Sequence, residues 1–415
     1  MTTTIVIIFL IVYLGMILGG LPFLQLDRTG VALLGAIAMI SFDAVTLEEA
    51  AEAVHLPTII LFFSFMVLSA QMRLGGFYGW VTRGLAALPH SPAGLLGAMM
   101  IIVAVLSAIF SNDIVCLAIA PVLITACEKR RLDPVPYLLA LACAANIGSA
   151  WTLIGNPQNI LIGQTLRLSF HGYFLEAAVP VALGLAATWG LIAWQVRGQW
   201  HQPAASAMII PEEARNDAPF NPWQTAKGLI VAAVLLVAFV FGPWPREHVA
   251  LIAAGVLLMS RKLHSNKMLG LVDWELLVLF IGLFVVNHAL QRTGLVTKAV
   301  DDLAALGVDM RQPGPLFVGT FLLSNIVSNV PAVMLLLPLA QPPWAGPLLA
   351  LVSTLAGNLL IVGSIANIIV VDSAARRGIR IDWHRHARVG VPVTLVTLAI
   401  TAVWLALHMA RAASP

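Results

Sequence analysis

Two matched stretches decide the fold: Leu106-Ser-Ala-Ile-Phe-Ser-Asn-Asp113 and Leu323-Ser-Asn-Ile-Val-Ser-Asn-Val330. Each lies inside an apolar segment, 92–127 in the first half of the chain and 313–341 in the second. Polar side chains at mid-membrane depth are tolerated only when they are buried in protein or face a wet cavity. Because each segment is interrupted once and then ends in a short polar connection, we expect two re-entrant hairpins.

The composition around these stretches is that of a membrane protein. Of the 415 residues, 60% are hydrophobic and only 10% are charged, whereas soluble domains carry about 25% charged residues. A soluble chain could not bury so much apolar surface, so lipid must be part of its solvent. No nucleotide-binding Gly-Lys motif and no nucleophile–base constellation occurs in the sequence, so we expect neither an enzyme nor a cofactor. A nucleic-acid partner is not expected either.

Apolar segments long enough to cross a bilayer recur along the chain, since a spanning helix needs roughly 20 apolar residues. They cover about 4–24, 29–43, 57–72, 135–166, 173–196, 224–243, 247–260, 273–291, 345–374 and 389–410. Two of them, 135–166 and 345–374, are too long for one plain helix. Both contain Gly and Asn near the middle, which predicts helices that are broken inside the membrane.

The two halves also match outside the hairpins. Arg28-Thr-Gly-Val-Ala-Leu matches Arg246-Glu-His-Val-Ala-Leu, and Gly155-Asn-Pro-Gln-Asn159 matches Gly363-Ser-Ile-Ala-Asn367, in the same order along the chain. Matches that keep their order and include polar residues indicate an internal repeat.

The predicted fold is therefore an all-α polytopic membrane protein with two repeats, 1–196 and 224–415, joined by a cytoplasmic linker, 197–223. Each repeat has five spans, one of them broken, and one re-entrant hairpin. Because five is an odd number, the second repeat must enter from the opposite face. This is an inverted-topology repeat, a common plan in secondary transporters.

The placement of positive charge predicts the orientation. If the N-terminus is outside, most Lys and Arg residues fall on cytoplasmic connections, as the positive-inside rule requires. Arg28 is counted there, and the cluster His384-Arg-His386 is interpreted as part of a basic cytoplasmic loop. We expect a multi-pass protein of the cell inner (plasma) membrane, with the linker and the basic loops in the cytoplasm.

The hairpin tips and the helix breaks supply the candidate ligands. Carbonyl groups that lose their helical partners can bind a hard cation such as Na⁺, and free N–H groups at the start of the next helix favour an anion. The candidate substrate ligands are Ser111, Asn112, Asn159, Ser328, Asn329 and Asn367. The candidate cation ligands are Ser111, Asn112, Asp113, Gly155, Asn156, Ser328, Asn329, Gly363 and Ser364. No metal other than Na⁺ is expected.

Asp113 is the only carboxylate that these spans place deep in the membrane. An acid at this depth is a functional hypothesis by default, and we expect it to couple transport to Na⁺ or H⁺. The alternative is a neutral side chain that caps the second hairpin arm. No Arg or Lys lies on a tip or a break, so helix N-termini, Asn and Ser groups and co-bound cations would hold an anion.

With these motifs the chain resembles the ion transporter superfamily, which includes divalent anion–sodium symporters, arsenite permeases and citrate-transporter-like anion permeases. The likeness is carried by Ser111-Asn112, Asn146-Ile-Gly148, Leu153-Ile-Gly155-Asn-Pro-Gln-Asn159, Ser328-Asn329-Val-Pro331 and Gly357-Asn358 through Gly363 to Asn367. The resemblance implies a scaffold domain of outer spans and a transport domain of hairpins and broken helices. It also implies an elevator-type movement and often a homodimer.

The symporters in this superfamily carry Ser-Asn-Thr at both tips, where the tips and the unwound loops bind Na⁺ and the two tips hold substrate carboxylates. Here Asp113 and Val330 stand at the third position, and the Asn-Asp pair is similar to the arsenite permeases, which couple efflux to protons.

The expected function is secondary transport of a small anion, an oxyanion or a carboxylate, coupled to Na⁺ or H⁺ across a lipid bilayer. Three alternatives stay open. One is an arsenite or antimonite efflux permease, another is a Na⁺/H⁺ antiporter that uses Asp113, and the third is a membrane scaffold without a transported substrate.

Overall fold

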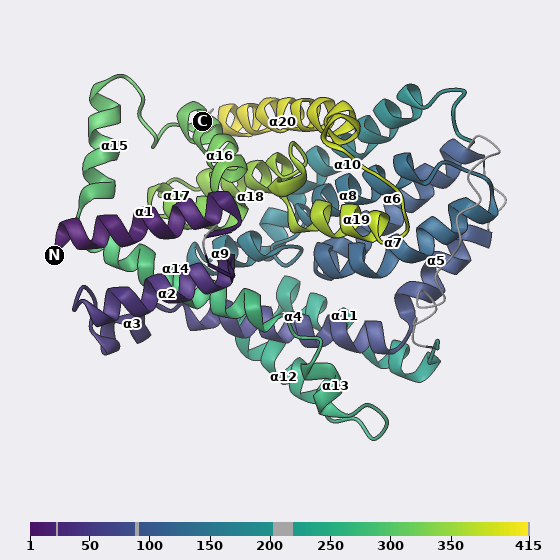
Figure 1. Ribbon diagram of the computed structural model, residues 1–415, viewed down its shortest axis with the longest axis horizontal. Coiled ribbons are helices and arrows are strands. Elements are labelled where there is room, and N and C mark those ends of the chain that lie inside the picture. Colours follow the sequence, from purple (N-terminus) through teal and green to yellow (C-terminus); the bar gives the residue numbers. More distant parts are fainter. Residues whose placement is uncertain (22–23, 88–90, 202–218, 414–415) are drawn as a thin grey trace.

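The computed structural model describes residues 1–21, 24–87, 91–201 and 219–413 (Figure 1). Within these ranges nearly all regular structure is helical, and the only strands form one short antiparallel pair, β1 (Gly20–Leu21) and β2 (Leu26–Asp27). The predicted fold class, an all-α polytopic membrane protein, is confirmed. Residues 202–218 of the predicted linker lie outside the described residues.

The first half of the chain runs from α1 to α10. Its helices are α1 (Thr2–Leu18), α2 (Arg28–Ser41), α3 (Leu47–Ala53), α4 (Leu56–Leu74), α5 (Phe77–Ala87), α6 (Pro92–Ile109), α7 (Asn112–Lys129), α8 (Pro134–Ser149), α9 (Pro157–Thr165) and α10 (Phe170–Gln195). Helices α6 and α7 form the first hairpin, which turns at 110–111. Helices α8 and α9 are the two parts of a helix that is interrupted over 150–156.

The second half repeats this order of elements. Its helices are α11 (Pro222–Phe241), α12 (Arg246–Leu258), α13 (Ser265–Leu269), α14 (Trp274–Arg292), α15 (Leu295–Ala305), α16 (Pro313–Val327), α17 (Asn329–Leu336), η2 (Leu337–Leu339), α18 (Ala345–Ala356), η3 (Ile361–Gly363), α19 (Ile365–Ala375) and α20 (Trp383–Ala413). The second hairpin consists of α16 and α17, and the second break separates α18 from α19.

The chain breaks have local causes. Asn156 is extended, and its Oδ1 accepts the backbone N–H of Asn159 at 3.0 Å, which caps α9. Pro157 follows at the first helical position, where a missing N–H costs nothing. In the second hairpin Ser328 adopts a φ of 76° and a ψ of 161°, a backbone conformation rare for a residue with a Cβ. The two tips therefore turn in different ways.

The helices pack in two layers. One layer, here called the scaffold layer, contains α1–α4 and α11–α14, in which α2 packs against α14 and α4 against α12. The other, the hairpin layer, contains α6–α10 and α16–α20, in which α6 packs on α8, α16 on α18, α7 on α19 and α10 on α20. Figure 1 shows α2, α4 and α12 along the lower part of the molecule and α8, α10 and α20 along the upper part.

Six helices in the described chain are long and apolar enough to cross a membrane: α4, α6, α10, α11, α14 and α20. The predicted spans at 4–24, 29–43 and 247–260 are shorter in the structure. The first ends at Leu18 because Gly19, with a φ of 81°, takes the left-handed conformation that closes a helix. Many apolar side chains on the outside remain exposed, as lipid contact requires.

Helix α20 begins earlier than the predicted span at 389–410. The carboxylate of Asp382 accepts the backbone N–H of Arg385 at 2.8 Å, which caps the helix and holds the pKa of Asp382 below its usual range. His386 therefore lies inside α20, is 3% exposed, and has its Nε2 3.2 Å from the carbonyl oxygen of Asn358. The interpretation of this histidine as part of a loop was wrong.

Candidate functional site

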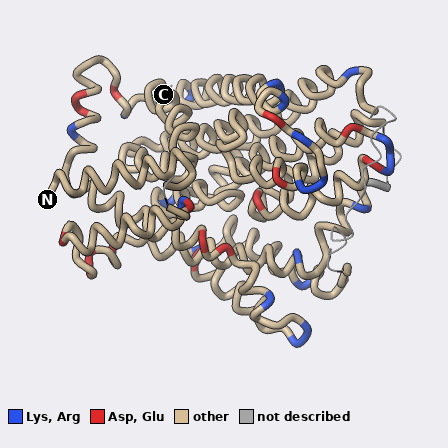
Figure 2. The backbone as a smooth tube through the Cα atoms, in the orientation of Figure 1, with Lys and Arg blue, Asp and Glu red and all other residues tan. Residues whose placement is uncertain are grey.

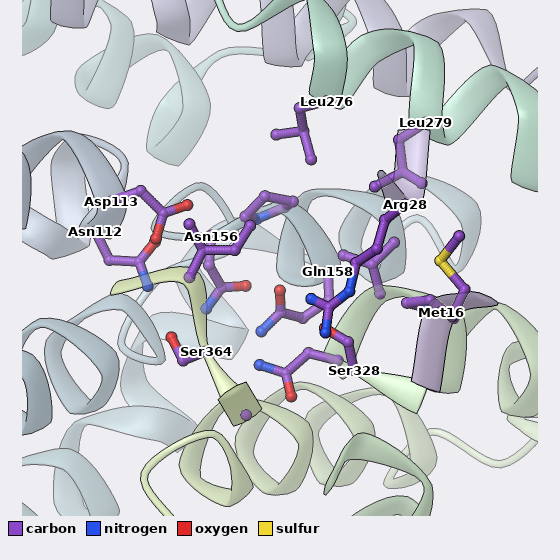
Figure 3. Close-up of a pocket in the computed structure, with 16 residues that line it drawn as sticks. Met16, Arg28, Asn112, Asp113, Asn156, Gln158, Leu276, Leu279, Ser328 and Ser364 are labelled. Atoms are coloured by element: carbon purple, nitrogen blue, oxygen red, sulfur yellow. The ribbon is translucent and has the colours of Figure 1, made fainter. Parts of the chain in front are cut away.

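A cavity of about 70 Å³ lies where the two hairpin tips meet the two helix breaks (Figure 3). Its lining residues are Asn112 and Asp113 from the first tip, Asn156, Pro157 and Gln158 from the first break, Ser328, Asn329, Val330 and Pro331 from the second tip, Gly363, Ser364 and Ile365 from the second break, and Met16, Arg28, Leu276 and Leu279 from the scaffold layer. All four polar segments singled out in the sequence thus contribute to one cavity.

Each hairpin tip contacts the break of its own half. The backbone N–H of Asn112 donates to the carbonyl of Gly155 at 3.4 Å. A Cβ on Gly155 would lie 2.8 Å from the carbonyl oxygen of Ser107, so only glycine allows this approach. In the second half, a Cβ on Gly357 would lie 3.2 Å from Nδ2 of Asn329. The tips and breaks therefore form one packed unit in each half.

Asn146, at the C-terminal end of α8, connects the two halves. Its Nδ2 donates to Oδ1 of Asn358 at 2.9 Å and to Oδ1 of Asn367 at 3.2 Å. Its Oδ1 accepts from Nδ2 of Asn112 at 3.1 Å and from Oγ of Ser364 at 2.9 Å. Every polar position of this amide is used, so it holds the first tip against the second break.

A second network surrounds Thr354 on α18. The Nδ2 of Asn156 donates to the Thr354 hydroxyl at 3.0 Å and to Oγ of Ser149 at 3.1 Å. The Nε2 of Gln158 donates to the same Thr354 hydroxyl at 3.2 Å. The first break is therefore bonded to the broken helix of the other half, which gives the cavity wall a defined shape.

The structure places Asn159 and Asn367 behind the cavity wall. The Nδ2 of Asn159 donates to the carbonyl of Thr152 at 3.1 Å, and the Nδ2 of Asn367 donates to the carbonyls of Gly357 and Leu360 at 2.8 and 2.9 Å. These two amides satisfy the backbone of the unwound segments. Of the remaining predicted ligands, Ser111 and Gly155 also lie outside the lining, whereas Asn112, Asp113, Asn156, Ser328, Asn329, Gly363 and Ser364 face the cavity.

Several side-chain oxygen atoms of the residues that line the cavity have no hydrogen-bond partner among the described residues. Asp113 makes no side-chain hydrogen bond with any described residue, so the capping alternative is not what the structure shows. The Oδ1 atoms of Asn112 and Asn329 are buried, and neither has a hydrogen-bond partner in the described chain. A buried acceptor without a partner is costly, and oxygen ligands suit hard cations.

Arg28 is a cavity residue that the sequence interpretation did not name as a candidate ligand. The charge count assigned it to a cytoplasmic connection, and the structure shows it at the start of α2, on the cavity wall. Figure 3 shows its guanidinium group directed into the cavity near Gln158 and Ser328. The sequence shows that Arg28 matches Arg246. It does not show that Arg28, in the scaffold layer, faces a cavity lined mostly by the hairpin layer, because no local sequence pattern indicates a contact between distant segments.

Comparison with known proteins agrees with this architecture. A family model described as "Citrate transporter" (CitMHS) matches residues 5–346. A 46 kDa membrane protein of Mycobacterium leprae is 27% identical, and the match covers 92% of this chain and 94% of that protein. The silicon efflux transporter LSI3 of Oryza sativa subsp. japonica is 29% identical over 91% of this chain and 92% of its own length.

A solved structure supports the fold. The YdaH transporter of Alcanivorax borkumensis superimposes with a TM-score of 0.58 at 15% identity, over 99% of this chain and 98% of the other. Since the family model covers most of the sequence, and the relatives named above match nearly end to end, the chain belongs to the citrate transporter (CitMHS) family of membrane transporters.

Proposed function

We propose that this protein is a secondary active transporter that moves a small anion, an oxyanion or a small carboxylate, through the central cavity together with Na⁺ or H⁺. One observation carries the proposal. Two hairpin tips and two helix breaks from opposite halves of the chain line a single cavity. Broken backbone at membrane depth is tolerated only where it is buried in protein or lines a water-filled cavity, and secondary transporters place their substrate sites at such breaks.

The helix ends favour an anion. Helices α7, α9, α17 and α19 begin at Asn112, Pro157, Asn329 and Ile365, and each of these residues lines the cavity. The first N–H groups of a helix have no partner within the helix, and the helix dipole adds partial positive charge at the same end. The N–H groups of Asn112 and Asn159 already have protein acceptors, but the partial positive charge of four helix ends still favours an anion in the cavity between them.

The unpartnered oxygens favour a coupling cation. The carboxylate of Asp113 and the Oδ1 atoms of Asn112 and Asn329 supply negative charge and lone pairs at the tips. Na⁺ would use these oxygens directly, and H⁺ would use the carboxylate.

The cavity volume favours a small substrate. The space of about 70 Å³ is enough for a few water molecules. This suits an oxyanion or a short carboxylate better than a large organic anion. The second candidate function is efflux of arsenite or antimonite, favoured by the Asn112-Asp113 pair at the first tip.

The two layers support an elevator-type movement with the hairpin layer as the moving part. We further propose that the N-terminus lies outside the cell membrane and the basic connections lie in the cytoplasm. In Figure 2 most Lys and Arg residues lie in the half of the molecule toward α5, and Figure 1 shows α15 and the N-terminus at the other end. This asymmetry supports the orientation.

The function is tested with purified protein in proteoliposomes. Citrate, succinate, sulfate, phosphate and arsenite are offered one at a time, with an imposed Na⁺ gradient, an imposed pH gradient or neither. We expect gradient-dependent movement of at least one anion and its loss in Asn112→Ala and Asn329→Ala. Asn266→Ala, on the exposed surface of α13, serves as the matched control.

The outcomes separate the alternatives. Sodium-dependent proton movement without any anion would replace anion transport by Na⁺/H⁺ exchange. Unchanged transport in both tip variants would place the pathway elsewhere in the molecule.

A further inference from the structure

We propose that Arg28 binds the transported anion, and that the anion lies between this guanidinium group and a cation held at Asp113. The inference rests on the proposed anion transport and adds to it the source of positive charge. It also gives a physical reason for the coupling of anion to cation.

Arg28 has no partner among the residues that the structure describes. No described residue forms an ion pair or a side-chain hydrogen bond with it. The neighbouring carboxylate of Asp27 is already used, since its Oδ1 accepts the backbone N–H of Gly30 at 2.7 Å as the cap of α2. Arg28 is partly buried, and a guanidinium group that is removed from water without a partner is unfavourable. A bound anion would remove that penalty.

The chemistry of the cavity agrees with this assignment. Among the described residues that line it, Arg28 is the only one with a positive charge and Asp113 the only one with a negative charge. Figure 3 shows the two side chains on opposite sides of the cavity, with Asn156 and Gln158 between them. A guanidinium group offers several donors in a planar arrangement that matches carboxylate and oxyanion oxygens.

This arrangement makes binding of anion and cation cooperative. An ionised Asp113 repels an anion in the same cavity, and this repulsion is stronger inside a protein than in bulk water because the effective dielectric constant is lower. Na⁺ or H⁺ at Asp113 removes the repulsion and leaves Arg28 to attract the anion. By linkage, the anion must raise the affinity for the cation by the same factor.

Arg28 also belongs to a different layer from most of the lining. It starts α2 in the scaffold layer, whereas the tips and breaks belong to the hairpin layer. A displacement of the hairpin layer would therefore separate the anion from Arg28 while the tip and break residues stay with it. Arg28 would then strengthen anion binding only in the conformation in which the hairpin layer lies beside it.

The test is isothermal titration calorimetry of detergent-purified wild type, Arg28→Gln and Arg28→Lys. Sulfate, phosphate, succinate, citrate and arsenite are the probes, each with and without Na⁺ at two pH values. We expect Arg28→Gln to weaken binding of the accepted anion about 10- to 100-fold, the range for a lost charge-assisted hydrogen bond. Arg28→Lys should lose less, because it keeps the charge.

The matched control is Arg246→Gln. Arg246 is the sequence counterpart of Arg28 and begins α12, but it donates to the carbonyl of Leu168 and does not line the cavity. Its anion affinity should equal that of the wild type. In Asp113→Asn the accepted anion should bind equally well with and without Na⁺.

The outcomes distinguish this inference from the proposed function. If the wild type binds an anion and both Arg28 variants bind it equally well, the assignment of Arg28 is wrong and anion transport stands. If the wild type binds none of the anions under any condition, the proposed function fails and this inference fails with it. A single cooperative unfolding transition of Arg28→Gln, at a melting temperature close to that of the wild type, shows that the variant is folded.

Discussion

Single amide groups decide how the site is held together. Asn146 uses both donors and both lone pairs to bond Asn112, Ser364, Asn358 and Asn367. An amide can do this because it offers two donors and two acceptor positions on one rigid plane. A carboxylate of the same shape has no N–H to donate. An aspartate at position 146 would therefore fit the space but could not donate the two hydrogen bonds to Asn358 and Asn367.

Asn146→Asp should destabilise the protein and weaken transport. Two hydrogen bonds lose their donor, and a charge enters a buried position. Measured membrane hydrogen bonds average about 0.6 kcal/mol, so with the buried charge we expect a loss of roughly 2 kcal/mol or more. Thermal unfolding in detergent measures it, with Asn266→Asp on the surface of α13 as the control. Equal melting temperatures for the two variants would show that the hydrogen bonds of Asn146 do not stabilise the contact between the first tip and the second break.

The predicted ligands differ from the residues that the structure places at and around the cavity, and the difference has a physical reason. Asn112 and Asn329 were found because a polar residue in an apolar stretch has a strong local signature. The roles of Asn146 and Arg28 depend on contacts between distant parts of the chain, such as the Asn146–Asn358 bond across 212 residues. No local pattern reports such a contact.

Close helix contacts position the hairpins. A Cβ on Gly148 of α8 would lie 2.5 Å from the carbonyl oxygen of Ala104 on α6, so the backbones touch at this crossing. The breaks in α8–α9 and α18–α19 were predictable because Gly, Asn and Pro interrupt helices locally. The end of α1 at Leu18 was not, because an apolar stretch continues past Gly19 and only its backbone conformation ends the helix.

Gly148→Ala should move the first hairpin away from α8. Overpacking typically costs about 1–3 kcal/mol, and the displaced tip should lower transport as well. Gly190→Ala on α10 is the matched control, since a Cβ there meets nothing within 4 Å. It should be neutral or stabilising by up to about 1 kcal/mol. Thermal unfolding of the two variants compares them directly, and an unaffected Gly148→Ala protein would contradict the close contact.

At the scale of the whole molecule, matching elements occupy opposite ends. Helices α5 and α15 are counterparts in the order of elements, and Figure 1 shows them at the two ends of the view. Each precedes a hairpin whose tip reaches the central cavity. This is the arrangement that two inverted repeats would produce. The repeat boundaries at 196 and 224 and the membrane orientation stay predictions.

The orientation predicts which cysteines a membrane-impermeant maleimide can reach. Asp302→Cys on α15 should react in intact cells, and Ser265→Cys on α13 only after permeabilisation, because the positive-inside rule places α13 in the cytoplasm. Both positions are exposed. The background should be low, since Cys116, Cys127 and Cys143 are buried. The reverse labelling pattern would invert the topology.

The central claim is that the tips and breaks form one cavity in which a cation and a small anion bind together. Its most direct test is the melting temperature of the purified wild type, measured against anion concentration with and without Na⁺ and across pH. The account predicts that one anion stabilises by about 2.7 kcal/mol at 100 times its dissociation constant, and that Na⁺ or a lower pH lowers that dissociation constant. An anion affinity that is the same with and without the cation, at every pH, would contradict it.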